Sequence, residues 1–191
     1  MERESRADIL INLPNSLTVL RILLVPVFVG FLLYEHFDYA LVTLLVAAVT
    51  DGLDGAIARF TDQRTRLGEY LDPLADKLLL TSAIITLSVL HFIPLWAVIL
   101  VVSRDAILLT GTIVANLTDI DIDIAPTWLG KGATLAQICY VIMVILLATG
   151  RVPAEAVAPV LAVMVILTTG SGVHYLFRGI QHLNSSNEKK G

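Results

Sequence analysis

The sequence predicts an all-α protein, an integral membrane bundle of six transmembrane helices preceded by a short amphipathic segment. Hydrophobic residues make up 56% of the 191 residues and charged residues only 16%, whereas about a quarter of the residues in soluble domains are charged. The apolar residues fall into six runs, each close to the roughly 20 residues that a helix needs to cross a bilayer. Short polar or Pro- and Gly-containing turns separate the runs.

The spans are expected in order, with short connections. The first begins after Pro14, because Asn15 and Ser16 are favourable helix N-caps. We expect a juxtamembrane segment at 1–15, one six-helix membrane domain at 16–182 and a polar tail at 183–191. The six predicted spans are 17–34, 39–60, 71–92, 95–116, 127–149 and 155–177.

The positive charges predict an orientation. Lysines and arginines gather in the loops and ends on the side of the two termini, and only Arg151 falls on the opposite side. Positively charged loops of membrane proteins stay in the cytoplasm. We therefore expect a multi-pass protein of the cell's inner membrane, with both termini and the stretch from Asp51 to Asp76 on the cytoplasmic side.

Four aspartates stand at the adjoining ends of the second and third spans: Asp51, Asp54, Asp72 and Asp76. Their spacings of three and four residues put each pair on one helical face. A charged side chain at membrane depth costs about 2.5–3.5 kcal/mol at a helix centre, and four carboxylates together would repel one another. A divalent cation would offset both effects, and all-oxygen ligands suit Mg²⁺, Mn²⁺ or Ca²⁺ rather than zinc.

Cations also lie within or beside the spans, and each has two interpretations. Arg21 either contacts a substrate or extends its guanidinium to the near interface. Arg104 either contacts a substrate or forms a structural ion pair with Asp105, and Lys131 is either a ligand or an interfacial anchor. Buried charges of both signs also describe an ion-coupled transporter, although the six spans show no evident duplication.

The aspartate stretch resembles the signature of one enzyme family, the CDP-alcohol phosphotransferases. The resemblance implies transfer of a phosphatidyl group from CDP-diacylglycerol to an alcohol with release of CMP, usually by a homodimer. It further implies two divalent cations, Mg²⁺ or Mn²⁺, held by the four aspartates, and Asp76 as the general base. The matching positions are Asp51, Asp54, Gly55, Ala58, Arg59, Gly68, Asp72 and Asp76.

A CDP site follows from the same resemblance. Gly55 and Ala58 lack bulk, so a nucleotide can lie close to the second span, although small residues also mediate helix contacts in membranes. Gly68 is expected to do the same from the loop, and Arg59 is the best-placed cation for the nucleotide end or its phosphates. The expected CDP-binding residues are Asp54, Gly55, Ala58, Arg59 and Gly68.

The acceptor is expected to be a glycerol-type hydroxyl. The sequences N-L-P-N at 12–15, D-P-L-A-D-K at 72–77 and Gly130-Lys131 resemble the glycerolipid branch of the family. Its phosphatidylglycerophosphate synthases use glycerol 3-phosphate, and its cardiolipin synthases use phosphatidylglycerol. The sequence S-R-D at 103–105, with Thr112 where the first kind carries a second arginine, slightly favours phosphatidylglycerol. The expected contacts to the acceptor or its phosphate are Arg21, Arg104 and Lys131, and no nucleic-acid partner is expected.

Overall fold

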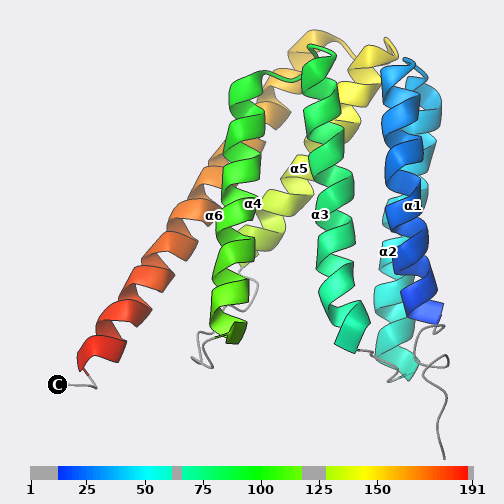
Figure 1. Ribbon diagram of the computed structural model, residues 1–191. Coiled ribbons are helices and arrows are strands. Elements are labelled where there is room, and N and C mark those ends of the chain that lie inside the picture. Colours follow the sequence, from blue (N-terminus) through cyan, green and yellow to red (C-terminus); the bar gives the residue numbers. More distant parts are fainter. Residues whose placement is uncertain (1–12, 62–65, 118–127, 189–191) are drawn as a thin grey trace, which may run out of the picture. The chain divides into compact units, whose positions relative to one another are not determined.

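The protein is all-α in a computed structural model, and six helices run along the described part of the chain (Figure 1). The predicted all-α class and the six helices are confirmed for the described residues, and the crossing of a membrane by all six helices stays a prediction. In chain order, the helices are α1 (Leu13–Leu33), α2 (Phe37–Thr61), α3 (Arg66–Val89), α4 (Leu95–Leu117), α5 (Trp128–Ala148) and α6 (Ala154–Glu188).

The structure describes the backbone of residues 13–61, 66–117 and 128–188. Within these ranges it describes the side chains of residues 20–50, 77–110, 128–175 and 177. Most of the predicted juxtamembrane segment lies outside the described residues, as do the last three residues of the polar tail.

Four helix ends differ from the prediction by three or more residues. Helix α1 begins at Leu13, so the prediction that the first helix begins after Pro14 is wrong; a proline is tolerated in the first turn of a helix, where its missing N–H would have no partner within the helix. Helix α3 ends at Val89 rather than at residue 92.

Helix α3 begins at Arg66, so Gly68 lies inside a helix and the prediction that it belongs to a loop is wrong. One glycine costs a helix only about 1 kcal/mol relative to alanine, and Glu69 in the same turn is favoured by the helix dipole. Helix α6 continues past the predicted end at Phe177 to Glu188, because polar residues end a membrane span without ending a helix.

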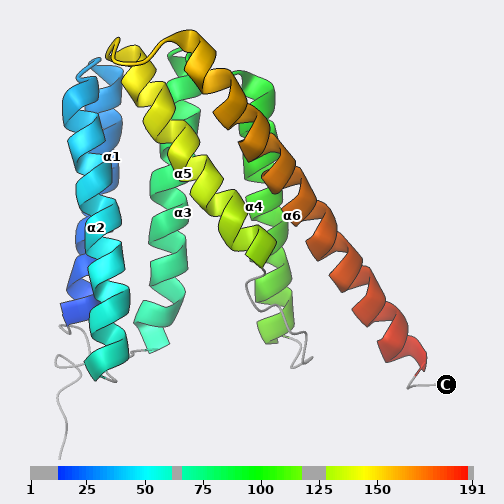
Figure 2. The same ribbon diagram turned by 180° about the vertical axis from the view of Figure 1, so that it is seen from behind.

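The chain divides into two compact units, unit 1 at residues 1–90 and unit 2 at residues 91–191. In unit 1, α1 packs against both α2 and α3, and the three helices run side by side (Figures 1 and 2). Alanines at positions 40, 47 and 83 are buried, and such small residues let helix backbones approach closely. Larger side chains complete the buried core: Phe28, Leu32, Leu44, Ile84 and Leu87.

In unit 2, α6 packs against both α4 and α5. Helix α5 ends in a Schellman motif, in which Gly150 adopts a φ of 73°. The N–H of Arg151 donates to the carbonyl of Leu146 over 3.0 Å, and the N–H of Gly150 donates to that of Leu147 over 2.9 Å. After this turn the chain returns along α5 as α6. The buried core of unit 2 includes Val101, Ala133, Tyr140, Val141, Val144, Ile145 and Met164.

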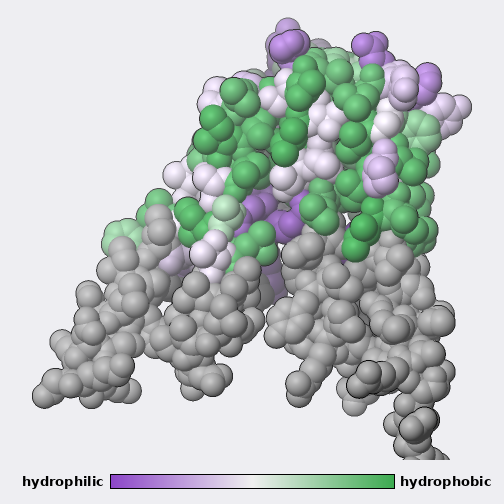
Figure 3. All heavy atoms as spheres, viewed as in Figure 1, coloured by the Kyte–Doolittle hydropathy of each residue, from purple (hydrophilic) through white to green (hydrophobic). Residues whose placement is uncertain are grey.

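Large hydrophobic side chains remain exposed on the described helices, as Figure 3 shows for one face. Two described segments, Trp128–Ala148 and Ala154–Tyr175, are long and apolar enough to cross a membrane by length and composition. Leu20–Leu33, Phe37–Thr50 and Lys77–Val89 are shorter apolar helical stretches. Outward-facing side chains such as Ile166, which is 68% exposed, suit a lipid environment because lipid chains are themselves apolar.

Candidate functional site

The backbone places the four aspartates on two consecutive helices of unit 1. Asp51 and Asp54 lie in the C-terminal half of α2, and Asp72 and Asp76 lie in the first three turns of α3. Their side chains lie outside the described residues. Within each pair, the three- or four-residue spacing on a helix keeps both positions on one face.

The chain itself limits how far apart these helix ends lie. Four residues, 62–65, connect Thr61 at the end of α2 to Arg66 at the start of α3. Even fully extended, this connection spans no more than about 18 Å between the two Cα atoms. Since α1 packs against both helices, the C-terminal end of α2 and the N-terminal end of α3 lie at the same end of unit 1 (Figures 1 and 2).

Arg21 lies on α1 at the depth of the aspartates. It stands twelve residues before the end of α1, Asp51 stands fourteen residues after the start of α2, and Asp76 stands thirteen residues before the end of α3. At 1.5 Å per residue, these distances are about 18, 21 and 20 Å from one end of unit 1. The Arg21 side chain is 1% exposed. A buried guanidinium therefore belongs to the same layer of unit 1 as two of the carboxylate positions.

The predicted CDP-binding positions continue the aspartate face of α2. Asp51, Gly55 and Arg59 are spaced by four residues, and Ala58 lies four residues after Asp54. Positions four apart are neighbours on a helix surface. The α2 positions thus form two adjacent rows. In the row of Asp51, the small residue Gly55 stands between a carboxylate position and the cation position Arg59. Gly68 lies in the first turn of α3, and the side chains of all these positions lie outside the described residues.

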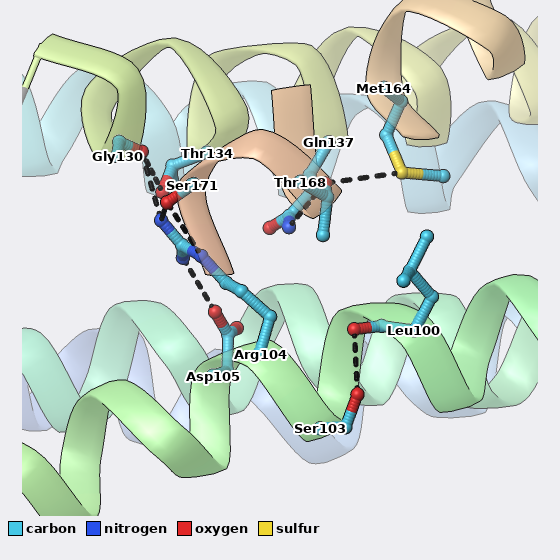
Figure 4. Close-up of polar contacts among 10 residues, drawn as sticks. All are labelled: Leu100, Ser103, Arg104, Asp105, Gly130, Thr134, Gln137, Met164, Thr168 and Ser171. Carbon is cyan, nitrogen blue, oxygen red and sulfur yellow. Dashed lines mark hydrogen bonds and ion pairs between the residues drawn. The ribbon is translucent and has the colours of Figure 1, made fainter. Parts of the chain in front are cut away.

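Unit 2 holds a second polar cluster around Arg104 (Figure 4). Arg104 and Asp105 lie midway along α4 and are 4% and 5% exposed. The guanidinium donates from Nη1 to Asp105 Oδ1 over 2.7 Å and from Nη2 to Ser171 Oγ on α6 over 2.9 Å. Nη2 also donates to the carbonyl of Gly130 on α5 over 3.2 Å, and Nε donates to Ser171 Oγ over 3.3 Å.

Lys131 follows Gly130 in the first turns of α5, and it is exposed. Its Nζ lies 5.3 Å from the ring centroid of Trp128, within the range of a cation–π interaction. Trp128 is 88% exposed, so this contact leaves the ammonium accessible to a ligand.

A third polar group lies between α5 and α6 (Figure 4). Gln137 Nε2 donates to Thr168 Oγ1 over 3.4 Å, and the Thr168 hydroxyl donates to the sulfur of Met164 over 3.6 Å. Gln137 and Thr168 are fully buried. The sequence did not single out these residues or Ser171, because isolated Gln, Thr and Ser residues in apolar runs carry no spacing signal.

The implied metal site fits the donor set of unit 1. Four carboxylate residues stand on two helix ends that a four-residue connection holds close together, and clustered carboxylates are the ligands that Mg²⁺ and Mn²⁺ prefer. Among residues with described side chains, no group of three or more His, Cys, Asp or Glu residues gathers to hold a metal. The four aspartates fall outside that part of the chain.

Comparison with known proteins identifies the family. The sequence profile of the CDP-alcohol phosphatidyltransferases matches residues 11–170. A probable phosphatidylglycerophosphate synthase of Mycobacterium tuberculosis is 35% identical over 90% of this chain and 83% of its own. The CDP-diacylglycerol–glycerol-3-phosphate 3-phosphatidyltransferase of Bacillus subtilis is 33% identical over 92% of this chain and 99% of its own.

A second group of relatives matches a shorter stretch at higher identity. The CMP-forming cardiolipin synthase of Homo sapiens is 41% identical over 52% of this chain and 34% of its own. Both groups of relatives carry the names of phospholipid-synthesising enzymes, which agrees with the enzyme class that the aspartate spacing indicated. The chain therefore belongs to the CDP-alcohol phosphatidyltransferase family, the phosphatidyl-transferring enzymes of phospholipid biosynthesis.

Proposed function

We propose that the protein transfers the phosphatidyl group of CDP-diacylglycerol to a hydroxyl of phosphatidylglycerol, forming cardiolipin and releasing CMP. The observation that carries the reaction class is the pair of consecutive helix ends bearing Asp51, Asp54, Asp72 and Asp76 at the spacing of the family signature. Family membership also removes the ion-coupled transporter as an explanation of the buried charges.

The four aspartates would hold two Mg²⁺ or Mn²⁺ ions. When bound, these ions would neutralise charge on the pyrophosphate of CDP-diacylglycerol and stabilise the leaving CMP. Asp51 and Asp72 serve as metal ligands, and Asp54 serves as a metal ligand that also belongs to the CDP site. Asp76 serves as a ligand and as the general base.

In the reaction, the acceptor hydroxyl oxygen attacks the phosphorus of the phosphatidyl group. A new P–O bond forms, and the bond from that phosphorus to the bridging oxygen breaks. CMP leaves with the bridging oxygen and its electron pair. The hydroxyl proton passes to a carboxylate oxygen of Asp76, which must lie within hydrogen-bond reach of the acceptor for this transfer.

CDP lies along the aspartate face of α2 and the first turn of α3. Gly55, Ala58 and Gly68 provide room for the nucleotide to approach the backbone, and Asp54 lies among them. Arg59, one turn after Gly55, contacts the phosphates, because a guanidinium donates charge-assisted hydrogen bonds to phosphate oxygens. Arg21, at the depth of Asp51, contacts the phosphate of the acceptor or of the donor.

Two observations favour phosphatidylglycerol as the acceptor. Asp105 compensates the charge of Arg104, and position 112 holds a threonine rather than a second arginine. A phosphodiester with one negative charge needs fewer free cations than the phosphomonoester of glycerol 3-phosphate. Lys131 is the exposed cation that remains in unit 2 among the residues already proposed for this role.

Glycerol 3-phosphate is the second candidate acceptor. The relatives that match along most of both chains are named as phosphatidylglycerophosphate synthase or glycerol-3-phosphate 3-phosphatidyltransferase. The same aspartate chemistry serves either acceptor, because each presents a glycerol hydroxyl as the nucleophile.

The proposed setting is the inner membrane. All six helices cross it, both termini and the aspartates lie on the cytoplasmic side, and two copies of the chain form a homodimer. The support is the apolar character of five helical stretches and the concentration of lysines and arginines in the loops on one side.

Release of CMP tests the proposal. Purified protein in detergent is given CDP-diacylglycerol with Mg²⁺ or Mn²⁺, and then phosphatidylglycerol or glycerol 3-phosphate in parallel reactions. Cardiolipin formation with the first acceptor alone supports the proposal. If product forms with glycerol 3-phosphate alone, glycerol 3-phosphate is the acceptor in place of phosphatidylglycerol. If no CMP is released with either acceptor and either metal, the proposed reaction is wrong.

A further inference from the structure

Arg104 is buried in unit 2 with most of its hydrogen-bonding capacity already used by its own chain. A guanidinium has five N–H donors. Four donor contacts engage it: one from Nη1 to Asp105, two from Nη2 to Ser171 and Gly130, and one from Nε to Ser171. Not more than one N–H remains for a substrate, and Asp105 compensates the positive charge.

These contacts join three helices. Arg104 and Asp105 belong to α4, Gly130 to α5 and Ser171 to α6 (Figure 4). Contacts of a planar guanidinium fix both distance and angle, because its donors form a rigid fork. The Arg104 side chain therefore sets how α4, α5 and α6 meet inside unit 2.

The contact to Gly130 acts on the start of α5. Gly130 precedes Lys131 in the chain, and its carbonyl also accepts from the hydroxyl of Thr134 over 3.2 Å. Two donors from different elements thus hold the peptide that leads directly into Lys131. Lys131 itself is exposed, with its ammonium beside the ring of Trp128.

We propose that Arg104, held by Asp105 and Ser171, is a positioning residue that fixes the first turn of α5 so that Lys131 meets the phosphate of the acceptor lipid. Arg104 acts through Lys131 and does not itself bind the acceptor. The inference rests on the proposed acceptor role of Lys131. It assigns Ser171 and the Gly130 carbonyl a part in acceptor specificity.

Ser171→Ala tests this with a small change. The variant removes the acceptor of two Arg104 contacts but keeps the arginine, the lysine and the fold of α6. We expect the KM for phosphatidylglycerol to rise about tenfold, the effect of losing a charge-assisted hydrogen bond worth about 1.4 kcal/mol. The KM for CDP-diacylglycerol and kcat are expected to stay unchanged. Ser103→Ala is the matched control, since among the described residues the Ser103 hydroxyl donates to the carbonyl of Leu100 in its own helix and to no other helix.

A double-mutant cycle separates positioning from direct binding. If Ser171 and Arg104 act through Lys131, then adding Ser171→Ala to Lys131→Gln leaves the acceptor KM of Lys131→Gln unchanged. Arg104→Lys keeps the charge but cannot reach three partners, so it is expected to resemble Ser171→Ala. A direct phosphate ligand would instead tolerate the lysine.

Three results would overturn the inference while leaving the proposed reaction intact. The first is an acceptor KM in the double variant that rises by the product of the effects of Ser171→Ala and Lys131→Gln. The second is an acceptor KM that Ser171→Ala leaves unchanged. The third is an equal rise of the KM for donor and for acceptor in Ser171→Ala, together with a lower thermal stability. Wild-type protein that releases no CMP with any metal would instead refute the proposed function, and the inference with it.

Discussion

The guanidinium of Arg104 donates to the carboxylate of its own neighbour in the chain, Asp105, over 2.7 Å between Nη1 and Oδ1. Adjacent residues on a helix point about 100° apart, so this contact requires the long arginine side chain to turn back toward the shorter one. Both side chains are nearly inaccessible to solvent. The two charges are therefore stable inside unit 2 only as a pair, which makes Asp105 as important to the cluster as Arg104.

Asp105→Asn is expected to destabilise the protein by about 1.5–3 kcal/mol, because a buried guanidinium loses a charged hydrogen-bond acceptor. Unfolding in detergent, followed by circular dichroism, measures the change. Asp38→Asn is the matched control. Asp38 is exposed in the first turn of α2, where a helix-dipole contact contributes less than about 1 kcal/mol. Equal losses in the two variants would contradict the importance of the buried pair.

Asp76→Asn is expected to reduce CMP release by a factor of about 100 or more, because general-base catalysis typically contributes 10²–10⁴-fold and a metal ligand is lost as well. The assay compares kcat for wild type, Asp76→Asn and the control Asp38→Asn. Binding of Mn²⁺, followed by electron paramagnetic resonance, separates the two roles. Turnover within tenfold of wild type would exclude Asp76 as the base.

Removal of divalent cations with EDTA is expected to abolish CMP release, and excess Mg²⁺ or Mn²⁺ is expected to restore it. The four clustered aspartates cannot neutralise a pyrophosphate without a cation, because carboxylates and phosphates repel one another. A spectrum of the EDTA-treated protein controls for unfolding. Undiminished release in EDTA would refute the proposed cation site.

Ala58→Leu is expected to raise the KM for CDP-diacylglycerol about tenfold or more by filling the space proposed for the nucleotide. Ala48→Leu is the matched control, since Ala48 lies on the same helix and is exposed. The same KM in both variants would remove Ala58 from the CDP site. Lower stability in Ala58→Leu at an unchanged KM would assign this residue to helix packing instead.

Gln137→Leu is expected to leave stability unchanged or raise it by about 1 kcal/mol. Oε1 of Gln137 is buried and accepts no hydrogen bond from the described residues, and an unsatisfied buried acceptor costs about 1–3 kcal/mol. Thermal unfolding in detergent measures the change, with Thr168→Val as a comparison that removes the donor to Met164. A clear loss of stability in Gln137→Leu would mean that Oε1 is satisfied in the folded protein.

The sequence was sufficient to predict the six helices, because each apolar run ends at a signal that acts locally. Gly150 illustrates this, since its backbone conformation ends α5 whatever lies around it. The predicted start of α3 was wrong because the polar residues before the apolar run were assigned to a loop, whereas the helix begins among them at Arg66. The cost of one glycine is small beside the gain from extending a helix that packs against α1.

The aspartate positions were predictable for the same local reason, since all four lie within one stretch of chain with helical spacing. The surroundings of Arg104 were not. Its partner Ser171 lies 67 residues away, and only the packing of α4 against α6 brings the two together. The sequence left open whether Arg104 pairs with Asp105 or contacts a substrate. In the structure Arg104 pairs with Asp105. We therefore propose a positioning role for Arg104 rather than a direct contact with a substrate.

The four-residue connection between α2 and α3 has a consequence for biosynthesis. Because every proposed carboxylate ligand lies between Asp51 and Asp76, the ligands have low contact order and can come together as soon as these two helices emerge from the ribosome. The proposed cation site can then form while unit 2, which carries the residues proposed to position the acceptor, is still being translated.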